Sequence, residues 1–299
     1  MNDTPAAGST TPPGDLPPRR HRDEFEPTAR AYNAGLFGKD HYEEDKAGFQ
    51  ELTEVAPLLP IAVSENRHFG FRGVTAAALG GVDQFLNLGL GFPTPDGISI
   101  ADVIRPHQPL ARVVHVDASQ VVASHGRAML ARVDNVSMVH ADAREPDLVL
   151  KEAAELLDLS KPLCIVATAL LHFWPDEQEP AAVLYEYMRA VPAGYLVLSH
   201  ACGEEMDALR YAQLRSIYQR RFAPIYPRTR AEVAAMLHGL DVLEPGLVEA
   251  SQWRSNDRRI DVGDAYFLAA VAKFGHYVVT FRREDRTSVE TGHPLSEAS

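Results

Sequence analysis

The apolar residues of this chain alternate between short continuous runs and longer segments in which they recur every three to four positions. Continuous runs are typical of strands buried on both faces, and the longer spacing is typical of one face of a helix. The clearest run is PLCIVATA at 162–169. Regular alternation of the two patterns predicts a parallel sheet with crossover helices on both faces.

Five β/α units and two closing strands account for the pattern from residue 84 to residue 274. Strands are predicted at 84–88, 112–116, 136–140, 162–169 and 194–199, with closing strands at 240–243 and 265–274. Helices are predicted between them at 119–130, 145–157, 181–191, 204–222 and 229–238. This order is the organisation of a class I methyltransferase, whose last strand inserts antiparallel, whereas a dehydrogenase sheet ends with a sixth parallel strand. The spacing of the apolar residues does not show whether the last strand runs parallel or antiparallel to its neighbours.

A two-glycine turn follows the first predicted strand, and an aspartate ends the second. The strand QFLNLG opens into Gly89, Leu90 and Gly91, and the strand ARVVHVD ends on Asp117. Glycines let a ligand approach the backbone, and a carboxylate at the tip of the second strand can accept both hydroxyls of a ribose. The third glycine of a dinucleotide-binding turn is replaced by the stretch 92–94. The pattern therefore predicts a nucleoside site for S-adenosylmethionine, with NAD as the alternative.

Further candidate site residues follow the third, fourth and fifth strands. Asp142 is placed to accept from an adenine amino group, and capping of a turn is the alternative. Ala118 and Ala143, next to the two aspartates, complete the expected cofactor contacts. His172 and His200 follow the fourth and fifth strands, and each is either a general base near neutral pH or a structural histidine.

Helical patterns precede the first strand, and glycines interrupt them. A helix that begins near residue 27 is broken at 35–38 and resumes over 43–55, and another covers 63–79. A glycine inside a helix costs about 1 kcal/mol relative to alanine, so the break is expected to have a positional use. We expect a glycine-hinged lid over the cofactor, with Tyr32 in the site and Lys39 reaching a carboxylate. A plain loop between two helices is the alternative.

Four regions follow from these patterns. Residues 1–26, rich in Pro, Gly, Ser and Thr, are expected to be disordered because they cannot bury enough apolar surface. A helical lid is expected over 27–80, the cofactor-binding domain over 81–276, and a polar C-terminal extension over 277–299.

Composition and charge exclude several kinds of partner. The chain has 299 residues, 45% of them hydrophobic, and a net charge of −12, so its surface repels phosphate backbones and no nucleic acid is expected. No apolar run approaches membrane-spanning length and no signal-peptide pattern begins the chain, so no membrane partner is expected. Cys164 and Cys202 lie in unrelated contexts, which predicts a reducing, cytoplasmic location without disulfide or metal. The expected partner is a small-molecule substrate, and a homodimer is an open alternative.

Short motifs stand in a fixed order from about residue 28 to residue 274. They are Ala31-Tyr32-Asn33 to Gly38-Lys39-Asp40 with Asp45, Glu65-Asn66-Arg67, Gly89 to Thr94, Val113 to Asp117, His140 to Arg144, Leu171 to Asp176, Ser199-His200-Ala201, Arg230 to Val233, Pro245 to Val248 and Trp253-Arg254. Together they resemble the actinobacterial S-adenosyl methyltransferase family, once catalogued only as a domain of unknown function. The resemblance implies a Rossmann-like class I fold with a seven-stranded, mostly parallel sheet. It also implies an S-adenosylmethionine site containing Gly89, Gly91, Asp117 and Asp142, under the segment 32–40.

Two departures from the family pattern bear on the chemistry. Family members usually carry an acidic residue where this chain has Asn87, and their Asn-x-His-Glu pattern is replaced by residues 97–100. The missing charge normally orders the glycine turn and faces the methionine ammonium through water. We therefore expect weaker cofactor binding that is not abolished, because Asn87 still hydrogen-bonds. The lost His-Glu pair leaves the active-site chemistry open.

Three functions remain in competition. The leading hypothesis is an S-adenosylmethionine-dependent methyltransferase acting on a small molecule in specialised metabolism, with Tyr32, His172 and His200 as candidate catalytic groups and most acceleration coming from proximity. The second, favoured by Asn87 and the changes at 97–100, is a cofactor-binding module without methyl transfer that serves dimerisation or sensing. The third is an NAD-dependent oxidoreductase, which is disfavoured by Thr94 at the third glycine position.

Overall fold

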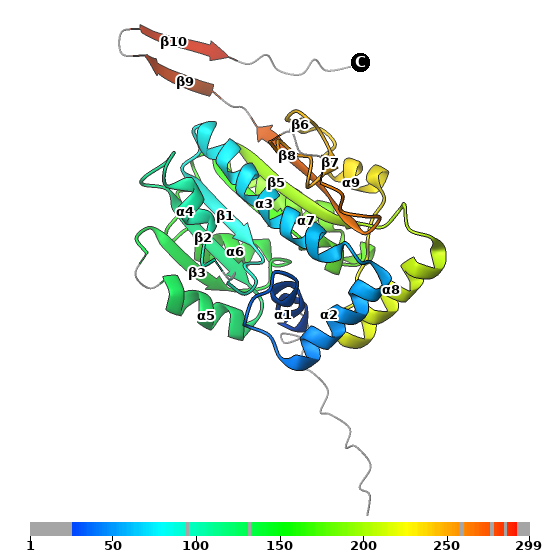
Figure 1. Ribbon diagram of the computed structural model, residues 1–299. Coiled ribbons are helices and arrows are strands. Elements are labelled where there is room, and N and C mark those ends of the chain that lie inside the picture. The colour runs from blue at the N-terminus through cyan, green and yellow to red at the C-terminus, as the bar shows by residue number, and fades with distance from the viewer. Residues whose placement is uncertain are drawn as a thin grey trace, which may run out of the picture.

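The computed structural model describes residues 26–93, 96–130, 133–256, 260–275, 278–283 and 286–291. Its strands are β1 (Gln84–Leu88), β2 (Arg112–Asp117), β3 (Val136–His140), β4 (Leu163–Thr168), β5 (Ala193–Cys202), β6 (Asp241–Val242), β7 (Val248–Glu249), β8 (Tyr266–Gly275), β9 (Val278–Arg283) and β10 (Arg286–Thr291). The first eight form one sheet in the order β3-β2-β1-β4-β5-β8-β6, with β7 pairing to β8 (Figure 1). β9 and β10 pair with each other as an antiparallel hairpin.

The direction of the last long strand of this sheet decides the fold class. Neighbouring strands run parallel across β3-β2-β1-β4-β5. β8 pairs antiparallel with β5 along its whole length of ten residues, and it also pairs antiparallel with β6. This arrangement confirms the predicted α/β class I methyltransferase fold with an antiparallel last strand. The two-residue β7 adds an eighth strand to the seven predicted.

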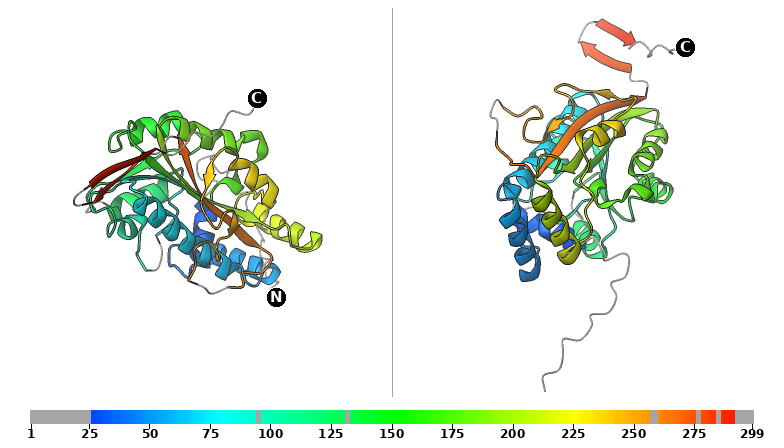
Figure 2. Two further views of the ribbon diagram at one scale, coloured as in Figure 1. Left: turned by 90° about the horizontal axis from the view of Figure 1, so that it is seen from above. Right: turned by 90° about the vertical axis from the view of Figure 1, so that its right-hand side faces the viewer.

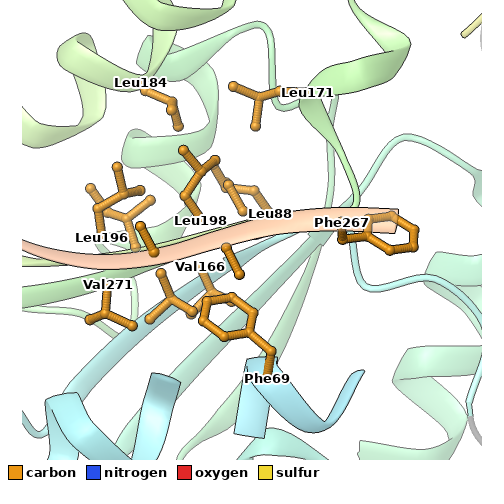
Figure 3. Close-up of a cluster of buried hydrophobic side chains, with 14 of the residues drawn as sticks. Phe69, Leu88, Val166, Leu171, Leu184, Leu196, Leu198, Phe267 and Val271 are labelled. Atoms are coloured by element: carbon orange, nitrogen blue, oxygen red, sulfur yellow. The ribbon is translucent and has the colours of Figure 1, made fainter. Parts of the chain in front are cut away.

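Helices cover both faces of the sheet (Figures 1 and 2). They are α1 (Glu26–Gly35), α2 (Glu43–Val55), α3 (Leu59–Leu79), α4 (Ile100–Ile104), α5 (Gln120–Leu130), α6 (Pro146–Ala153), α7 (Pro180–Arg189), α8 (Ala208–Arg221) and α9 (Arg230–Met236). Figure 3 shows Leu184 of α7 and Phe69 of α3 on opposite sides of the strands, and both side chains are fully buried. The sheet is therefore the middle layer of three. None of the described helices is long and apolar enough to span a membrane.

α3 belongs to the core of the domain. It packs against β4, β5 and β8, and its Phe69 and Val74 are fully buried. A Cβ atom at Gly73 would lie only 2.5 Å from Cγ1 of Val197 in β5, so the helix approaches the sheet closely. The predicted lid over 27–80 is thus corrected in its C-terminal part. Only α1 and α2 remain candidates for a lid, because the sheet covers the apolar face of α3.

Some helices and strands are shorter than predicted because the apolar pattern continues into the turns that follow them. The helix predicted over 145–157 ends with α6 at residue 153, because the N–H groups of Glu155 and Leu156 bond three residues back instead of four. The strand predicted over 240–243 is reduced to the two residues of β6. The predicted tail, apart from Glu26, and the predicted extension, apart from β9 and β10, lie outside the described residues.

Two glycines of α3 offer a matched test of this packing. Gly73→Ala is expected to lower the free energy of unfolding by about 2 kcal/mol, because the new methyl group overlaps Val197. Gly70→Ala is expected to leave it unchanged or raise it by up to about 1 kcal/mol. The nearest atom to a Cβ at Gly70, Cγ2 of Thr168, lies 3.8 Å away, and alanine favours the helix. Urea denaturation of both variants measures the difference, and equal stabilities would contradict the close approach of α3 to β5.

Candidate functional site

A cavity of about 270 Å³ lies where the parallel strands end. Its walls come from α1, α3 and α5, from β1, β2 and β4, and from the loops that follow the first four strands. The predicted site residues that line it are Tyr32, Gly89, Leu90, Gly91, Asp117, Ala118, Asp142 and Ala143. The other predicted residues, Lys39, His172 and His200, are not part of its lining.

The glycine turn and Asp117 are joined by hydrogen bonds. Gly89 and Gly91 have positive φ angles of 76° and 65°, which side-chain-bearing residues rarely adopt. This conformation lets the N–H of Gly91 donate to Oδ2 of Asp117 at 3.0 Å, while Ser119 N donates to Oδ1 at 2.9 Å. Apart from its chain neighbours, no atom of the described residues lies within 4 Å of a Cβ built at Gly91, so the turn has an open side. The turn and the tip of β2 thus form one unit that faces open space.

Asp117 keeps hydrogen-bonding capacity for a ligand. Burial raises the pKa of its carboxyl group above the ordinary value, and the donors at Gly91, Ser119 and Leu90 oppose that rise. A carboxylate accepts about four hydrogen bonds, so further donors, such as the hydroxyls of a sugar, can still bind. Such donors would also offset the cost of burying the charge.

Asp142 caps a turn and also lines the cavity. Its Oδ1 accepts from the backbone N of Arg144 at 2.9 Å, and both of its oxygens accept from Nε of Arg144 at 2.9 and 3.0 Å, so it caps the turn after β3. It also lines the cavity, together with apolar side chains that include Leu90, Met129 and Leu130. A carboxylate beside an apolar slot is suited to a flat ring with an amino group.

The glycine break between α1 and α2 places Asn33 against the turn after β1. The buried Asn33 donates from Nδ2 to the carbonyl of Pro93 at 2.8 Å and accepts at Oδ1 from the N–H of Asp40 at 3.0 Å. A Cβ atom at Gly38 would lie 2.3 Å from Asn33 Oδ1. The break therefore makes room for the side chain of Asn33, which ties α1 to the turn after β1. Lys39 is exposed and outside the cavity lining, which corrects the prediction that it reaches a carboxylate in the site.

Tyr32 lines the cavity with its hydroxyl group already bonded. The hydroxyl donates to the carbonyl of Val63 at 3.2 Å and accepts from Nδ2 of Asn66 at 2.9 Å. Burial raises the pKa of Tyr32 to about 12, against the opposing effect of Asn66. The phenol therefore stays protonated at neutral pH and provides a wall and a dipole instead of a base.

His172 and His200 belong to a buried network that is separate from the cavity lining. His172 accepts at Nδ1 from the N–H of Ala201 at 3.1 Å, and Arg228 donates to Nε2 of His200 at 2.9 Å. Arg228 also donates to the carbonyl of Trp174, a residue that does line the cavity, at 3.0 Å. Burial holds the pKa of His172 well below its ordinary value and lowers that of His200 to about 4. The predicted catalytic role of both is corrected, because neither ring reaches the cavity.

The cavity also has polar residues that were not among the predicted site residues. Arg67 of α3, Asn87 of β1 and His115 of β2 all line it. His115 stands within the apolar run VVHV, and a histidine in the middle of a buried strand was the signal that could have revealed it. Arg67 was visible only as part of a motif. Among the described residues, no group of three His, Cys, Asp or Glu side chains is arranged to hold a metal ion.

Comparison with known proteins identifies the family. The S-adenosyl methyltransferase family model matches residues 19–275. The chain belongs to this family. A candidate methyltransferase from Thermobifida fusca YX is 28% identical, with 83% of this chain and 94% of that protein covered and a TM-score of 0.75. A DUF574 family protein from Streptomyces avermitilis MA-4680 is also 28% identical, with 84% and 99% covered and a TM-score of 0.77. No protein of curated function matches the chain.

Membership in the S-adenosyl methyltransferase family makes the chain an S-adenosylmethionine-dependent methyltransferase and decides against NAD as the cofactor. The residues present fit this cofactor. The open side of the turn at Gly91 leaves room for a ligand over the backbone, and Asp117 offers a carboxylate to a ribose. The cavity also carries apolar walls suited to an adenine ring.

The buried neutral histidines predict that the protein loses stability in acid. Burial lowers the pKa of His115 and His200 to about 4 and that of His172 well below 6.5. The unfolded chain therefore binds more protons below pH 6.5, and the free energy of unfolding should fall as the pH falls toward 4, by about 1.4 kcal/mol per pH unit for each histidine. Urea denaturation between pH 7 and pH 5 measures this slope.

Substituting one buried histidine separates its contribution to the pH dependence of stability from the contributions of other titrating groups. His172→Asn is expected to reduce the slope by about 1.4 kcal/mol per pH unit. The matched control is His107→Asn, because His107 is exposed and should leave the slope unchanged. An unaltered slope in His172→Asn would show that His172 is not held neutral by burial.

Asp117 can be tested through cofactor binding. Asp117→Asn retains the shape of the side chain but only one acceptor oxygen, and losing a hydrogen bond to a charged group costs about 1.5–3 kcal/mol. The dissociation constant of S-adenosylhomocysteine, measured by calorimetry, is therefore expected to rise at least about tenfold. Asp83→Asn, at an exposed residue just before β1, is the control. Equal affinity in wild type and Asp117→Asn would exclude Asp117 from the site.

Proposed function

We propose that this chain transfers the methyl group of S-adenosylmethionine to a small molecule bound in the same cavity. The observation that carries the proposal is the composition of the cavity lining. Beside the glycine turn and Asp117, the cavity is lined by the aromatic side chains of Tyr32, Phe71 and Phe173. Aromatic walls next to a polar nucleoside site suit an apolar or planar acceptor.

In this proposal the cofactor lies across the carboxyl ends of β1, β2 and β3. Gly89, Leu90 and Gly91 pass beneath it, and Asp117 with Ala118 holds the ribose. Asp142 and Ala143 hold the adenine. The support is that all of these residues line one cavity and that the turn is already ordered by Asp117. A preformed turn lowers the entropy cost of binding.

No group in the described part of the cavity lining is suited to remove a proton at neutral pH. Among the described residues of its lining, Tyr32 has a pKa of about 12, and burial lowers the pKa of His115 to about 4. Both aspartates are assigned to the nucleoside. S-adenosylmethionine supplies an electrophilic methyl group on a sulfonium, so the chain contributes chiefly by holding the acceptor in line with it. We infer an acceptor atom with an available lone pair at neutral pH, such as an unprotonated nitrogen, a thiolate or a phenolate.

The closure of the cavity by α1 supports an acceptor of low molecular mass. The bond from Asn33 to the Pro93 carbonyl brings α1 over the turn after β1, and Thr28 and Tyr32 of this helix line the cavity together with Leu36, which follows it. A nucleic acid would in addition meet a net charge of −12. α1 and α2 thus act as the lid in this proposal, with Tyr32 as its inner surface.

In this proposal a buried network positions the loop after β4 and takes no part in the chemistry. Its members are His172, His200 and Arg228. Arg228 bonds the carbonyls of Leu171 and Trp174 and the ring of His200. These bonds hold the loop after β4, from which Phe173 and Trp174 reach the cavity. The two histidines therefore shape the wall of the acceptor site without contacting the reacting atoms.

Transfer of labelled methyl groups tests the proposal. The protein is incubated with methyl-labelled S-adenosylmethionine and a low-molecular-mass metabolite extract, and the products are separated by mass spectrometry. Label is expected in a small molecule, and Asp117→Asn is expected to reduce the amount at least tenfold at limiting cofactor, as the loss of a hydrogen bond to Asp117 predicts. The same assay is repeated with a panel of amines, thiols and phenols. Label found only in protein or nucleic acid, or in no member of this panel, would contradict the proposal.

A further inference from the structure

Polar atoms without partners point to a ligand contact deeper in the cavity. Among the described residues, the buried side-chain atoms without a hydrogen bond include Oγ1 of Thr28 and Nε2 of His115, and both residues line the cavity. Such an atom costs about 1–3 kcal/mol when it stays unpaired. His115 is the stronger case, because only 1% of its surface is exposed. A buried nitrogen of this kind is expected to meet a partner that the chain itself does not supply.

His115 lies in a recess beneath the rim of the sheet. It stands beside Asn87 in the β1–β2 register, and Asn87 stands beside Val166 in the β1–β4 register. All three line the cavity, so they form a row across its floor. From this row β2 continues for two residues to Asp117 and β4 for two residues to Thr168, whereas β1 ends at the next residue, Leu88. Gly70 of α3 also lines the cavity, and the nearest atom to a Cβ built there, Cγ2 of Thr168, lies 3.8 Å away.

Asn87 determines which nitrogen of His115 carries the proton. Its Nδ2 lies 3.1 Å from Nδ1 of His115. An amide NH₂ group only donates, so Nδ1 accepts, and the proton of the neutral ring resides on Nε2. An aspartate at this position would accept from Nδ1 and leave Nε2 as an acceptor. The asparagine therefore makes His115 a hydrogen-bond donor toward the recess.

Arg67 adds a positive charge to the same cavity. Among the described residues of the lining it is the only lysine or arginine. Its guanidinium group lies 4.7 Å from the ring centre of Phe71, and its two hydrogen bonds within the described chain, to Asp96 and the Ile98 carbonyl, both start from Nη2. Other donors of the guanidinium are thus left for a ligand. The guanidinium already forms an ion pair with Asp96 at 2.8 Å, so its remaining N–H donors, together with the neutral Asn87 and His115, are what the lining offers to an anion.

We propose that Nε2 of His115 and the guanidinium of Arg67 bind the carboxylate in the methionine part of S-adenosylmethionine. The inference rests on the cofactor position in the proposed function. The nucleoside end carries the acids Asp117 and Asp142, which repel a carboxylate. The recess at His115 and the lining at Arg67 instead supply hydrogen-bond donors. His115 is thus a positioning residue for the cofactor.

Calorimetry with two ligands tests the assignment. S-adenosylhomocysteine carries the amino acid part, and 5′-methylthioadenosine lacks it. His115→Leu is expected to weaken S-adenosylhomocysteine about tenfold, as the loss of a hydrogen bond to a charged group predicts, and to leave 5′-methylthioadenosine unchanged. His115→Gln is expected to restore most of the affinity, because its amide nitrogen can donate in place of Nε2. The control is His107→Leu, at an exposed position.

The outcomes distinguish this inference from the proposed function. Unchanged affinity for S-adenosylhomocysteine in His115→Leu would overturn the contact. Equal losses for both ligands would show a structural role and would overturn it as well. Failure of the wild-type protein to bind either ligand would overturn the proposed cofactor position itself, whereas a loss confined to S-adenosylhomocysteine supports both.

A measurement on the wild-type protein does not depend on the folding of the variants. Nitrogen NMR of ¹⁵N-histidine-labelled protein, with His115→Gln used to assign the signal, reports which ring nitrogen is protonated. A proton on Nε2 of His115 whose resonance shifts on addition of S-adenosylhomocysteine, and less on addition of 5′-methylthioadenosine, is the expected result. A proton on Nδ1, or equal shifts with both ligands, would overturn the proposal.

Discussion

The hydrogen bond from the Gly91 N–H to Asp117 is the interaction on which the site depends. It joins the turn after β1 to the tip of β2, two segments 26 residues apart in the chain. Only the positive φ angles of Gly89 and Gly91 direct that N–H toward the carboxylate. The parallel sheet makes the contact available, because it brings the carboxyl ends of neighbouring strands to one edge. Sheet direction, glycine conformation and a buried charge therefore act together in one structural unit, which in the proposed function holds the nucleoside of the cofactor.

Burial shifts the pKa values of the cavity's titratable groups in two opposite directions. It raises the pKa of Asp117 and of Tyr32, and it lowers that of His115. The result is a protonated phenol and a neutral imidazole, neither of which exchanges protons readily near pH 7. Methyl transfer to an acceptor that already has a lone pair needs orientation more than acid–base catalysis. The electrostatics of the site and the reaction of its family are consistent with each other.

Buried polar side chains from distant parts of the chain hold two walls of the cavity, α1 and the loop after β4. Asn33 ties α1 to the loop after β1, and Arg228 ties the loop after β4 to the end of β5 through His200. Each side chain satisfies backbone groups that would otherwise be unpaired, so its removal would cost both stability and shape. The glycine at position 38 is needed because Asn33 occupies the space that a side chain would take. Apolar packing forms the core, and these hydrogen bonds position the segments that surround the cavity.

The sequence by itself determined the strands of the sheet, the glycine turn and the place of Asp117 at the end of β2. Strands buried on both faces require continuous apolar runs, and a turn with positive φ requires glycine, so both leave a local record in the chain. Only the tertiary structure decided that α3 joins the core, that His172 and His200 face Arg228, and that His115 reaches the cavity. Those outcomes depend on which distant group pairs with a buried polar atom and on which side of a strand the ligand space lies, and no local pattern records either.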